Sequence, residues 1–499
     1  MFKRKRKKDV SFQLVAPDTV AVKGRPEKTC TLDEYDVLKK ELRDFDPIPK
    51  AVILSLDIDP NPVGDIPLKD KLFPYQLEGV RRAIAHGGRA LIADEMGLGK
   101  SLQGIALALY YKDPFCVICP SYLRFNWKNE LHKWGVEAMV VKKKEKPFVG
   151  NIIISYDIAH KVIDRLAFKT IICDESHYMK NRKSLRARKI VPLLKRTPHV
   201  FLLTGTPALN RPVELFMQMH AVRPFYFRKY TDYVHRYCNA HQSFLGFLDV
   251  TGSSNEKELA LLLKNTGMIR RLKRDVLTQL PEKRRSILHV EGDRDAEITA
   301  LFEEWDEINR SIETMDLEDA RKASFRRQQV VSELFRKTCH AKIRVVKRVV
   351  LDVLDQGIPF IVFCYHKAMV SALLEAIPEA ISITGDTPME SRQAMVDEFQ
   401  RGEKTVAILS MLAAGTGLTL TACSTILFAE TYFVPGVLLQ AEDRCHRIGQ
   451  KNVVDVRYII AKHTLDSRVH KKVLRKIDTL DACVDGRSDR DMSFYESKF

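Results

Sequence analysis

The sequence predicts an α/β protein with two doubly wound parallel-sheet lobes, a helical insertion between them and a small N-terminal α+β appendage. Short runs rich in Ile, Val, Leu and Phe alternate with helix-like stretches in two separate regions, 89–203 and 359–430. A charged stretch with helical periodicity, 208–340, separates these regions. The chain has 499 residues, which is too long for one ordinary core because domains hold about 100–200 residues.

The charge balance of the chain is basic. It carries 81 Lys and Arg against 64 Asp and Glu, a formal net charge of +17, with 45% apolar residues. This composition is typical of a folded protein with a polyanionic partner, and it does not separate DNA from RNA or an acidic membrane surface. There is no apolar run of about 18 residues and no apolar secretory signal. We therefore expect no membrane partner, and a location in the nucleus, or in the cytoplasm or nucleoid of a prokaryotic source.

The ten cysteines are scattered along the chain. The one close pair, Cys116 and Cys119, lies in the apolar run FCVIC, and no second pair or histidine cluster stands at metal-ligand spacing. We interpret this pair as part of a buried strand, and we expect no structural zinc.

The N-terminal part divides into a basic tail, 1–10, and an appendage with a linker, 11–68. Six consecutive cations at 3–8 are typical of a nuclear-import signal or a DNA-binding arm, and equally of a solvated tail. Helical spacing appears in 33–45, whereas the apolar run 47–56 indicates a strand. The proline-rich stretch 59–67 is a loop that separates the appendage from the first lobe.

The remaining chain divides into four parts. The first lobe, 69–207, has expected strands in RALIA, FCVIC, NIIIS, KTIIC and HVFLL. The region 208–340 is expected to form a helical insertion, the end of the first lobe and a linker. The second lobe, 341–475, has expected strands in PFIVFCYH, AISITG, KTVAILS and STILFAE. A C-terminal tail, 476–499, completes the chain.

A phosphate-binding loop comes after the first of these strands. The segment DEMGLGKS, 94–101, stands between the strand RALIA and a helical run. Such a junction aims backbone N–H groups at a phosphate. Lys100 is placed to reach the β and γ phosphates and Ser101 to hold Mg²⁺, so ATP and Mg²⁺ are the expected cofactors. The loop departs from the general P-loop pattern at its first position, where Asp94 replaces glycine.

An acidic pair comes after the strand KTIIC. Asp174 and Glu175 begin the segment DESH, and carboxylates at the end of a strand beside a P-loop can serve two different purposes. One can hold the metal ion, and the other can orient or deprotonate the attacking water. We assign Asp174 to the metal and Glu175 to the water. A surface acidic pair is the alternative, which the upstream P-loop disfavours.

Four segments in this order carry a family resemblance. DEMGLGKS, DESH, LTGTP (203–207) and QAEDRCHRIGQ (440–450) resemble motifs I, II, III and VI of the superfamily-two helicase-like ATPases, in the spelling of the Swi/Snf class. The resemblance extends from Leu72 to about Val473, and Asp94 is usual in that class. It implies two RecA-like lobes with one ATP bound between them.

The resemblance also assigns roles to individual residues. The nucleotide-binding set comprises Gln76 at the adenine edge, and Asp94, Gly97, Gly99, Lys100, Ser101, Gly415, Gly417 and Gln440. The resemblance implies that Arg444 and Arg447 act in catalysis with Lys100, Asp174 and Glu175, because an arginine brought across a cleft neutralises charge on the γ-phosphoryl group. The residues expected to couple the lobes or contact DNA are Pro120, Ser121, Thr204, Thr206 and Thr416.

Further segments narrow the resemblance within the class. MIRRLKRDVLTQLPEKRR (268–285) is similar to the segment after the first lobe throughout the class. The stretches 334–370 and 11–53 are similar to the HARP-type annealing helicases, which rewind separated DNA strands. No segment resembles a bromodomain, a chromodomain or a HAND-SANT-SLIDE module, so a histone reader is not expected.

The predicted function is a DNA-dependent ATPase that translocates on double-stranded or forked DNA and reanneals strands or remodels replication forks. A nucleosome or protein–DNA remodeller of the same class, an RNA-dependent helicase of the wider superfamily and a non-enzymatic DNA-binding scaffold are the alternatives. DESH and HRIGQ argue against the RNA helicases, and the intact ATP-site residues argue against the scaffold. Expected partners are double-stranded or branched DNA, with single-strand-binding or replication proteins as candidates.

Overall fold

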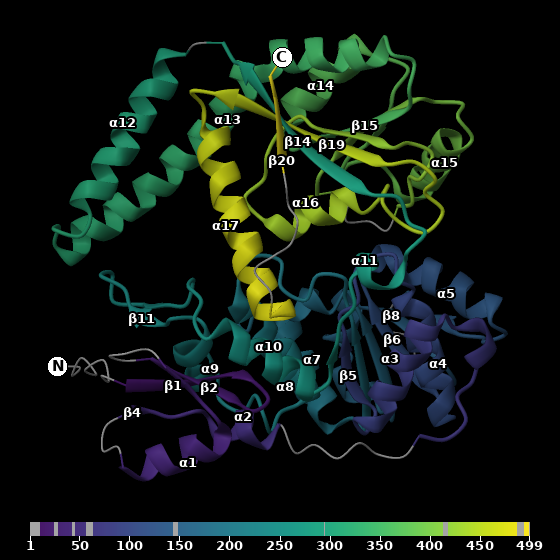
Figure 1. Ribbon diagram of the computed structural model, residues 1–499. Helices are drawn as coiled ribbons and strands as arrows, with labels where there is room; N and C mark the ends of the chain where they lie inside the picture. The colour runs from purple at the N-terminus through teal and green to yellow at the C-terminus, as the bar shows by residue number, and fades with distance from the viewer. Residues whose placement is uncertain are drawn as a thin grey trace.

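The structure is a computed structural model that describes residues 10–23, 28–41, 45–55, 63–142, 148–293, 295–412, 418–486 and 494–498. The cation run at 3–8 and the predicted site residues Gly415, Thr416 and Gly417 lie outside this range. Two sheet-containing lobes are stacked one above the other, with an N-terminal module beside the first (Figure 1). The predicted fold class is confirmed.

The N-terminal module is a four-stranded sheet with the order β3-β2-β1-β4. Its elements are β1 (Val10–Ala16), β2 (Thr19–Lys23), β3 (Lys28–Cys30), α1 (Leu32–Glu41), β4 (Phe45–Asp46) and α2 (Lys50–Leu54). The strand expected within 47–56 is wrong, because the structure forms helix α2 there. A short apolar run does not distinguish a strand from a buried helical turn, and Pro49 at the N-cap favours a helix start.

The first lobe contains a seven-stranded sheet with the order β13-β5-β10-β9-β6-β8-β7. Every pair in this sheet is parallel, so the carboxyl ends of the strands share one edge. Its elements up to residue 222 are α3 (Pro74–Ala85), β5 (Arg89–Ile92), α4 (Lys100–Tyr111), β6 (Phe115–Cys119), α5 (Arg124–Lys133), β7 (Met139–Val140), β8 (Ile152–Ser155), α6 (Tyr156–Ala159), β9 (Thr170–Asp174), α7 (Leu185–Arg196), β10 (His199–Leu203) and α8 (Leu215–Val222).

The region after α8 completes the first lobe. It forms α9 (Tyr230–Tyr237), β11 (His241–Gln242), β12 (Leu248–Asp249), α10 (Glu256–Asn265), β13 (Met268–Ile269) and α11 (Lys273–Val276). Strand β13 pairs with β5 at the sheet edge. The N-terminal module is fixed to this region by the buried carboxylate of Glu258, which accepts hydrogen bonds from Arg236 and from the backbone N–H of Leu14.

The second lobe contains another parallel seven-stranded sheet, with the order β16-β17-β15-β18-β19-β14-β20. The predicted boundary at 341 excludes β14 (Lys283–Glu291), whereas the structure pairs β14 with β19 inside this sheet. The other elements are α12 (Ala296–Ser311), α13 (Leu317–Leu354), β15 (Phe360–Cys364), α14 (Lys367–Ala376), β16 (Ile381–Ile383), α15 (Met389–Gln400), β17 (Val406–Ser410), β18 (Thr425–Phe428), α16 (Pro435–Glu442), β19 (Val454–Lys462), α17 (Leu465–Asp485) and β20 (Phe494–Lys498).

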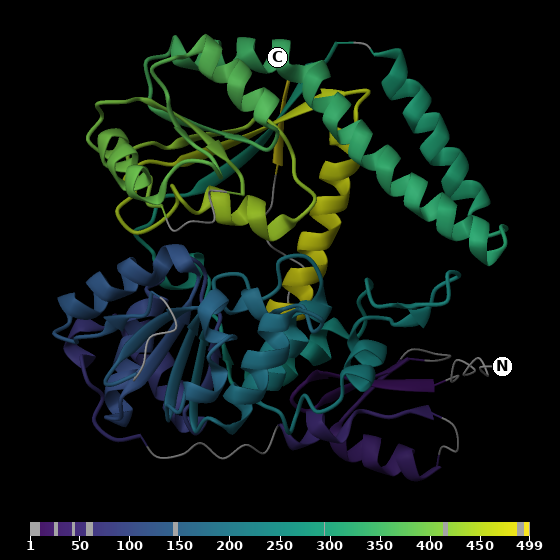
Figure 2. The same ribbon diagram turned by 180° about the vertical axis from the view of Figure 1, so that it is seen from behind.

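Helix α17 connects the lobes. It leaves the second lobe after β19 and descends to the first lobe, where it packs against α10 (Figure 2). Its last turns place Leu480, Cys483 and Val484 in the core cluster of the first lobe. The Arg270 guanidinium and the Asp485 carboxylate form a buried ion pair, with 2.6 Å between Nε and Oδ1. The segment predicted as a C-terminal tail therefore begins inside a helix that joins both lobes.

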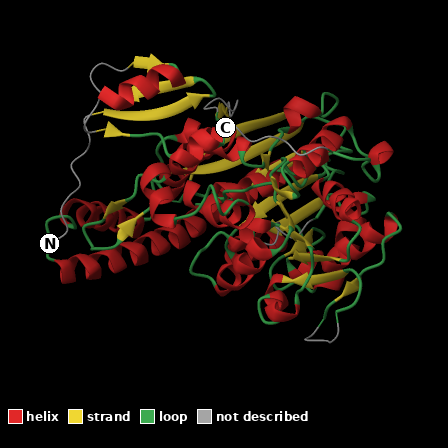
Figure 3. Cartoon of the chain, turned by 90° about the horizontal axis from the view of Figure 1, so that it is seen from below, coloured by secondary structure: helices red, strands yellow, loops and turns green. Residues whose placement is uncertain are grey.

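Helices α12 and α13 form a hairpin that projects from the second lobe, and it forms one side of the molecule seen from below (Figure 3). Among the described residues, no helix combines the length and apolar character needed to cross a membrane.

Candidate active site

The glycine-rich loop lies at the carboxyl end of β5, immediately before α4. Gly97 and Gly99 have φ values of 84° and 71°, a left-handed conformation that suits glycine and turns the loop sharply. Lys100, the first residue of α4, donates from Nζ to the carbonyl oxygens of Asp94 at 2.8 Å and Glu95 at 3.1 Å. The loop thus holds its own lysine inside the turn that would surround a phosphate.

Gln76 on α3 lies beneath this loop and is only 3% exposed. Its Nε2 donates to the carbonyl oxygen of Leu98 at 3.0 Å, and its Oε1 accepts from the N–H of Phe73 at 2.9 Å. A Cβ added to Gly99 would lie 2.2 Å from Gln76 Nε2. Gln76 therefore supports the loop, and only glycine at 99 leaves room for it.

The Asp94 carboxylate faces away from the loop interior. It is completely buried, and it accepts from Arg271 at 2.7 and 2.9 Å and from Gln103 at 2.8 Å. Such a bidentate arginine contact fixes a carboxylate in place. The structure therefore gives the Asp94 side chain a positioning contact with Arg271, whereas the family resemblance predicted a contact with the nucleotide.

The acidic pair stands at the end of β9. Asp174 Oδ2 accepts from Trp127 Nε1 at 2.8 Å, and Oδ1 accepts from the N–H of Glu175 at 2.9 Å. Burial and the neighbouring charge of Glu175 raise the pKa of Asp174 to about 6. Burial alone would also raise the pKa of Glu175, but His177, Lys100 and Arg444 together lower that pKa below its usual value. The two carboxylates therefore differ in their environment, as separate roles require.

The side chains near Asp174 suit a hard divalent cation. Ser101 and Asp174 line the same cavity and offer oxygen ligands, which Mg²⁺ prefers. Each Asp174 oxygen accepts a hydrogen bond and, with two lone pairs, keeps further acceptor capacity. This donor set fits the expected ion.

Two arginines approach from the second lobe. The Cβ of Arg447 lies 3.1 Å from the position that a Cβ on Gly97 would take, and Arg447 Nη1 donates to Thr419 Oγ1 at 2.9 Å. Burial and the nearby Arg444 charge lower the pKa of Arg447 to about 10. Arg444 is 4% exposed, and its Nε has no hydrogen-bond partner among the described residues, while its guanidinium interacts electrostatically with Tyr122 and Glu175.

One cavity of about 520 Å³ is lined by residues of both lobes. Its lining comes from α3, the glycine loop, α5, the end of β9 and the segment after α16. The predicted site residues that line it are Gln76, Gly97, Gly99, Ser101, Asp174 and Arg447. Residues from both lobes therefore face a single space, whereas the predicted catalytic residues Lys100, Glu175 and Arg444 are not among those that line it.

A chain of polar contacts leads from the acidic pair to the second lobe. His177 Nδ1 lies 3.2 Å from Glu175 Oε2 and 3.2 Å from Thr204 Oγ1. Thr204 Oγ1 accepts from the Thr206 N–H, and Thr206 Oγ1 accepts from Gln440 Nε2 at 2.8 Å. Gln440 thus contacts the LTGTP segment of the first lobe, whereas the resemblance placed it at the nucleotide.

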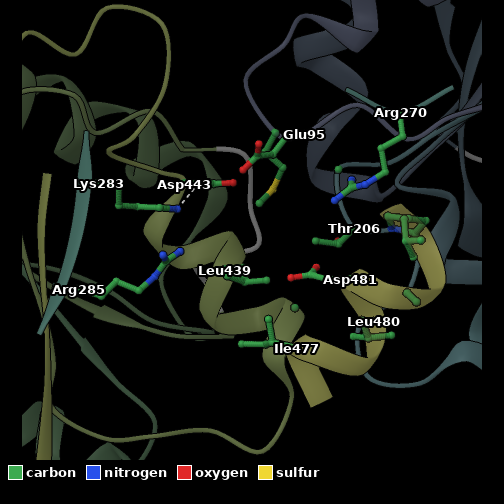
Figure 4. A pocket seen from close by; sticks show the side chains of 16 residues that line it. Glu95, Thr206, Arg270, Lys283, Arg285, Leu439, Asp443, Ile477, Leu480 and Asp481 are labelled. Carbon is green, nitrogen blue, oxygen red and sulfur yellow. Dashed lines mark hydrogen bonds and ion pairs between the residues drawn. The ribbon is translucent and has the colours of Figure 1, made fainter. Parts of the chain in front are cut away.

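A buried ion cluster lies beside this chain, around a smaller cavity of about 50 Å³ (Figure 4). Lys273 Nζ lies 2.9 Å from Asp443 Oδ1, and the Lys273 N–H donates to Glu95 Oε2 at 2.7 Å. Lys283 contacts Asp443 at 3.1 Å and Glu442 at 2.9 Å. The cluster connects the glycine loop to motif VI directly.

Sequence reasoning missed Lys273, Lys283 and Asp443. The signal available was the dense charge of 268–285 and of 442–447, which is normally interpreted as a solvated face. Trp127 and Arg271, which hold the Asp174 and Asp94 carboxylates, were also missed, because nothing in their spacing marks a partner far along the chain.

The predicted DNA-contact residues Pro120 and Ser121 lie at the carboxyl end of β6, where the first lobe's sheet meets its loops. Pro120 is buried and Ser121 is exposed. Cys116 and Cys119 lie on β6 itself and are completely buried.

Comparison with known families places two domain models on this chain. The SNF2-related domain matches residues 75–342, and the helicase conserved C-terminal domain matches residues 341–449. Together the two matches span residues 75–449, which include the glycine loop, DESH and LTGTP, and they end before β19, α17 and β20 of the second lobe.

Curated relatives agree with these matches. The chain is 38% identical over 488 residues to the SWI/SNF-related matrix-associated actin-dependent regulator of chromatin subfamily A-like protein 1 of Xenopus laevis, covering 90% of this chain and 50% of that protein. It is 39% identical over 454 residues to the DNA annealing helicase and endonuclease ZRANB3 of Bos taurus, covering 85% and 41%. The chain therefore spans about half the length of these relatives, or less.

Among solved structures, the Sulfolobus solfataricus SWI2/SNF2 ATPase core in complex with dsDNA matches with a TM-score of 0.39 and 22% identity. The match covers 84% of this chain and 94% of that one.

Proposed function

Because this chain belongs to the SNF2-related family, we propose that it is a DNA-dependent ATPase that translocates on double-stranded or forked DNA. Reannealing of separated strands and remodelling of replication forks are the proposed outcomes of that movement. The relative named a DNA annealing helicase supports this choice. The relatives are animal proteins whose names concern chromatin and DNA annealing, which supports action in the nucleus.

The single observation that carries the proposal is the shared cavity. Arg447 from the second lobe and Gly97, Ser101 and Asp174 from the first lobe line the same space of about 520 Å³. A cavity of this size is in the usual range for a small-molecule or cofactor site. We assign ATP to it, with its phosphates at the loop that precedes α4.

Each catalytic group then has a defined task. Lys100 exchanges its two loop carbonyls for phosphate oxygens, and Glu175, held by His177, orients the attacking water. Arg444 and Arg447 neutralise charge that develops on the transferred phosphoryl group, so hydrolysis requires both lobes. Ser101 and Asp174 would hold Mg²⁺, which when bound supplies further charge neutralisation at the phosphates.

Contacts between the two lobes would couple ATP hydrolysis to movement. Thr206 and Gln440 join the lobes beside the acidic pair, and Lys273 joins the glycine loop to Asp443. A change in nucleotide state therefore alters bonds that set the relative position of the lobes. Repeated closing and opening would move two DNA-gripping surfaces relative to each other.

The test uses ATP hydrolysis with a panel of nucleic acids. Turnover is measured for the wild-type chain and Lys100→Ala with blunt duplex, single strands, forked DNA, RNA and nucleosomes. Strong stimulation by forked DNA supports the fork-remodelling proposal, and a preference for nucleosomes supports the remodeller alternative instead. DNA binding without any ATP turnover would make the chain a scaffold. Lys100→Arg keeps the positive charge. Compared with Lys100→Ala, it serves as the matched variant that separates loss of charge from loss of the lysine's phosphate contact.

A further inference from the structure

The turn between β11 and β12 exposes a group of apolar side chains. Phe244, Phe247 and Leu248 are 47%, 57% and 42% exposed. The Ser243 N–H donates to the Phe247 carbonyl at 2.8 Å and the Gly246 N–H to the Ser243 carbonyl at 3.0 Å, so the turn is hydrogen-bonded within itself. Single exposed apolar residues are common, but a cluster at a hydrogen-bonded tip indicates a contact surface.

A row of cations on α17 leads toward this turn. Arg468, Lys472 and Lys476 are spaced by four residues and share one helix face. Arg468 pairs with Asp306 of α12 at 2.9 Å, and Lys476 donates to Asn210 Oδ1 in the first lobe at 2.7 Å. The row therefore spans the space between the projecting helical hairpin and the first lobe, about 12 Å along the helix.

Lys472, in the middle of this row, and Arg211 of the first lobe both lie near Lys476. Within the described part of the chain, neither Lys472 nor Arg211 has an ion pair with a carboxylate. Burial, followed by the nearby charges of Lys472 and Arg211, lowers the pKa of Lys476 to about 8. Like charges gathered in this way favour a polyanionic ligand.

Arg211 lies between the cation row and the apolar turn, because its charge acts on both Lys476 and Asp249. Arg211 interacts electrostatically with Asp249, the last residue of β12. Phe247 stands two residues before Asp249 in the chain, so at most about 7 Å separates their Cα atoms. Both views of the ribbon show β11, α12 and α17 on the same side of the molecule, away from α4 and α5 (Figures 1 and 2).

We propose that this α17–β11 surface, defined by Arg211, Lys472, Lys476, Phe244 and Phe247, binds an unpaired DNA strand. The cations contact consecutive phosphates, and the two phenylalanine rings stack on bases. Bases inside a duplex are already stacked and present only their edges, so the rings select unpaired nucleotides. A protein partner would not need both a phosphate-matching cation row and two exposed rings in one turn. The inference rests on the proposed DNA-dependent function and specifies where a fork's single strand is held.

The decisive experiment compares forked DNA that has unpaired arms with a blunt duplex of equal charge. Dissociation constants are measured for the wild-type chain and for the double variant Phe244→Ala/Phe247→Ala, with 2-aminopurine in one arm to report stacking. The fork-to-duplex affinity ratio should fall at least about ten-fold, because each stacked base contributes about that much. The wild-type quenching of 2-aminopurine should also be lost. Phe225→Ala, which removes a first-lobe phenylalanine that is 67% exposed, is the matched control and should keep the wild-type ratio.

A second experiment tests the cation row. Lys472→Gln should weaken binding to the fork and reduce the slope of log affinity against log salt by about one, because one phosphate contact is lost. An unchanged fork-to-duplex ratio in the double variant, together with unchanged quenching, would overturn the proposal and leave protein docking as the use of the rings.

Failure of this proposal is distinguishable from failure of the proposed function. Stimulation of wild-type ATP turnover by blunt duplex tests the motor function without the phenylalanine variants. If duplex stimulates ATP turnover and the fork-to-duplex affinity ratio does not change in the double variant, only the assignment of this surface is wrong. If no DNA stimulates the wild-type chain, the DNA-dependent function itself is wrong, and the inference falls with it.

Discussion

Lys273 and Asp443 form a buried ion pair between the first lobe and motif VI, with 2.9 Å between Nζ and Oδ1. Their side chains are 3% and 4% exposed, and the same lysine donates its backbone N–H to Glu95 of the glycine loop. The pair therefore holds the arginines of the second lobe against the phosphate-binding loop. This contact would keep the two halves of the proposed catalytic centre together.

Removing one partner of this pair should lower the free energy of unfolding. Asp443→Asn leaves the buried Lys273 without its ion-pair partner, while Lys283 keeps Glu442. Breaking such a buried pair costs about 3 kcal/mol or more. We expect a clearly lower urea midpoint for unfolding. Asp306→Asn, which breaks a half-exposed ion pair with Arg468, is the control and should cost less than about 1 kcal/mol. Equal effects of the two substitutions would contradict the importance of the buried cluster.

The contact between Thr206 and Gln440 should control coupling. Thr206→Val removes the acceptor of the 2.8 Å hydrogen bond and leaves the buried Gln440 amide unpaired. We expect DNA stimulation of ATP turnover to fall about ten-fold, since one buried hydrogen bond corresponds to roughly that factor. ATP affinity should change little.

A double-mutant cycle checks this assignment. If the bond carries the coupling, Gln440→Ala and Thr206→Val together should reduce stimulation no more than either substitution alone. Thr314→Val, at an exposed threonine between α12 and α13, should be neutral. Fully additive losses would show that the two residues act separately.

DNA affinity should fall in the mildly alkaline range. The pKa of Lys476 is lowered to about 8 by burial and by Lys472 and Arg211, with Glu214 opposing this shift. Below this pKa the lysine is charged and attracts phosphate, and above it the charge is lost. Affinity for forked DNA should therefore decrease between pH 7 and 9 in the wild-type chain. Lys476→Arg should show a flatter dependence of affinity on pH, because arginine stays charged. If affinity in Lys476→Arg depends on pH as it does in the wild-type chain, Lys476 does not contact the phosphates.

Much of the fold was predictable because its central strands are buried on both faces. FCVIC and HVFLL form β6 and β10 as expected, since continuous apolar runs are typical of parallel strands covered by helices. Strand β14 was not predicted, because its sequence KRRSILHVE begins with charged residues. The structure pairs Arg285 with the buried Glu442 of α16 at 2.7 Å, so the charge is neutralised by a residue far along the chain. Local patterns carry no information about such a partner.

The candidate site likewise contains residues that the sequence predicts and residues that it does not. Gly97, Lys100 and Asp174 could be located because phosphate and metal chemistry imposes a local spacing at strand ends. Trp127 and Arg271 could not, because they act by fixing the carboxylates of Asp174 and Asp94 from elsewhere in the fold. Their role depends on packing, which is visible only in three dimensions.

The most direct test of a single ATP site shared by both lobes is the turnover of Arg447→Ala. Turnover in the presence of DNA and ATP affinity are measured in parallel, with Arg401→Ala as the control at an exposed arginine of the same lobe. The shared site predicts ATP affinity near that of the wild-type chain and turnover about 10³-fold lower, the range of an arginine that stabilises phosphoryl transfer. Wild-type turnover in Arg447→Ala would contradict a catalytic centre completed across the lobes.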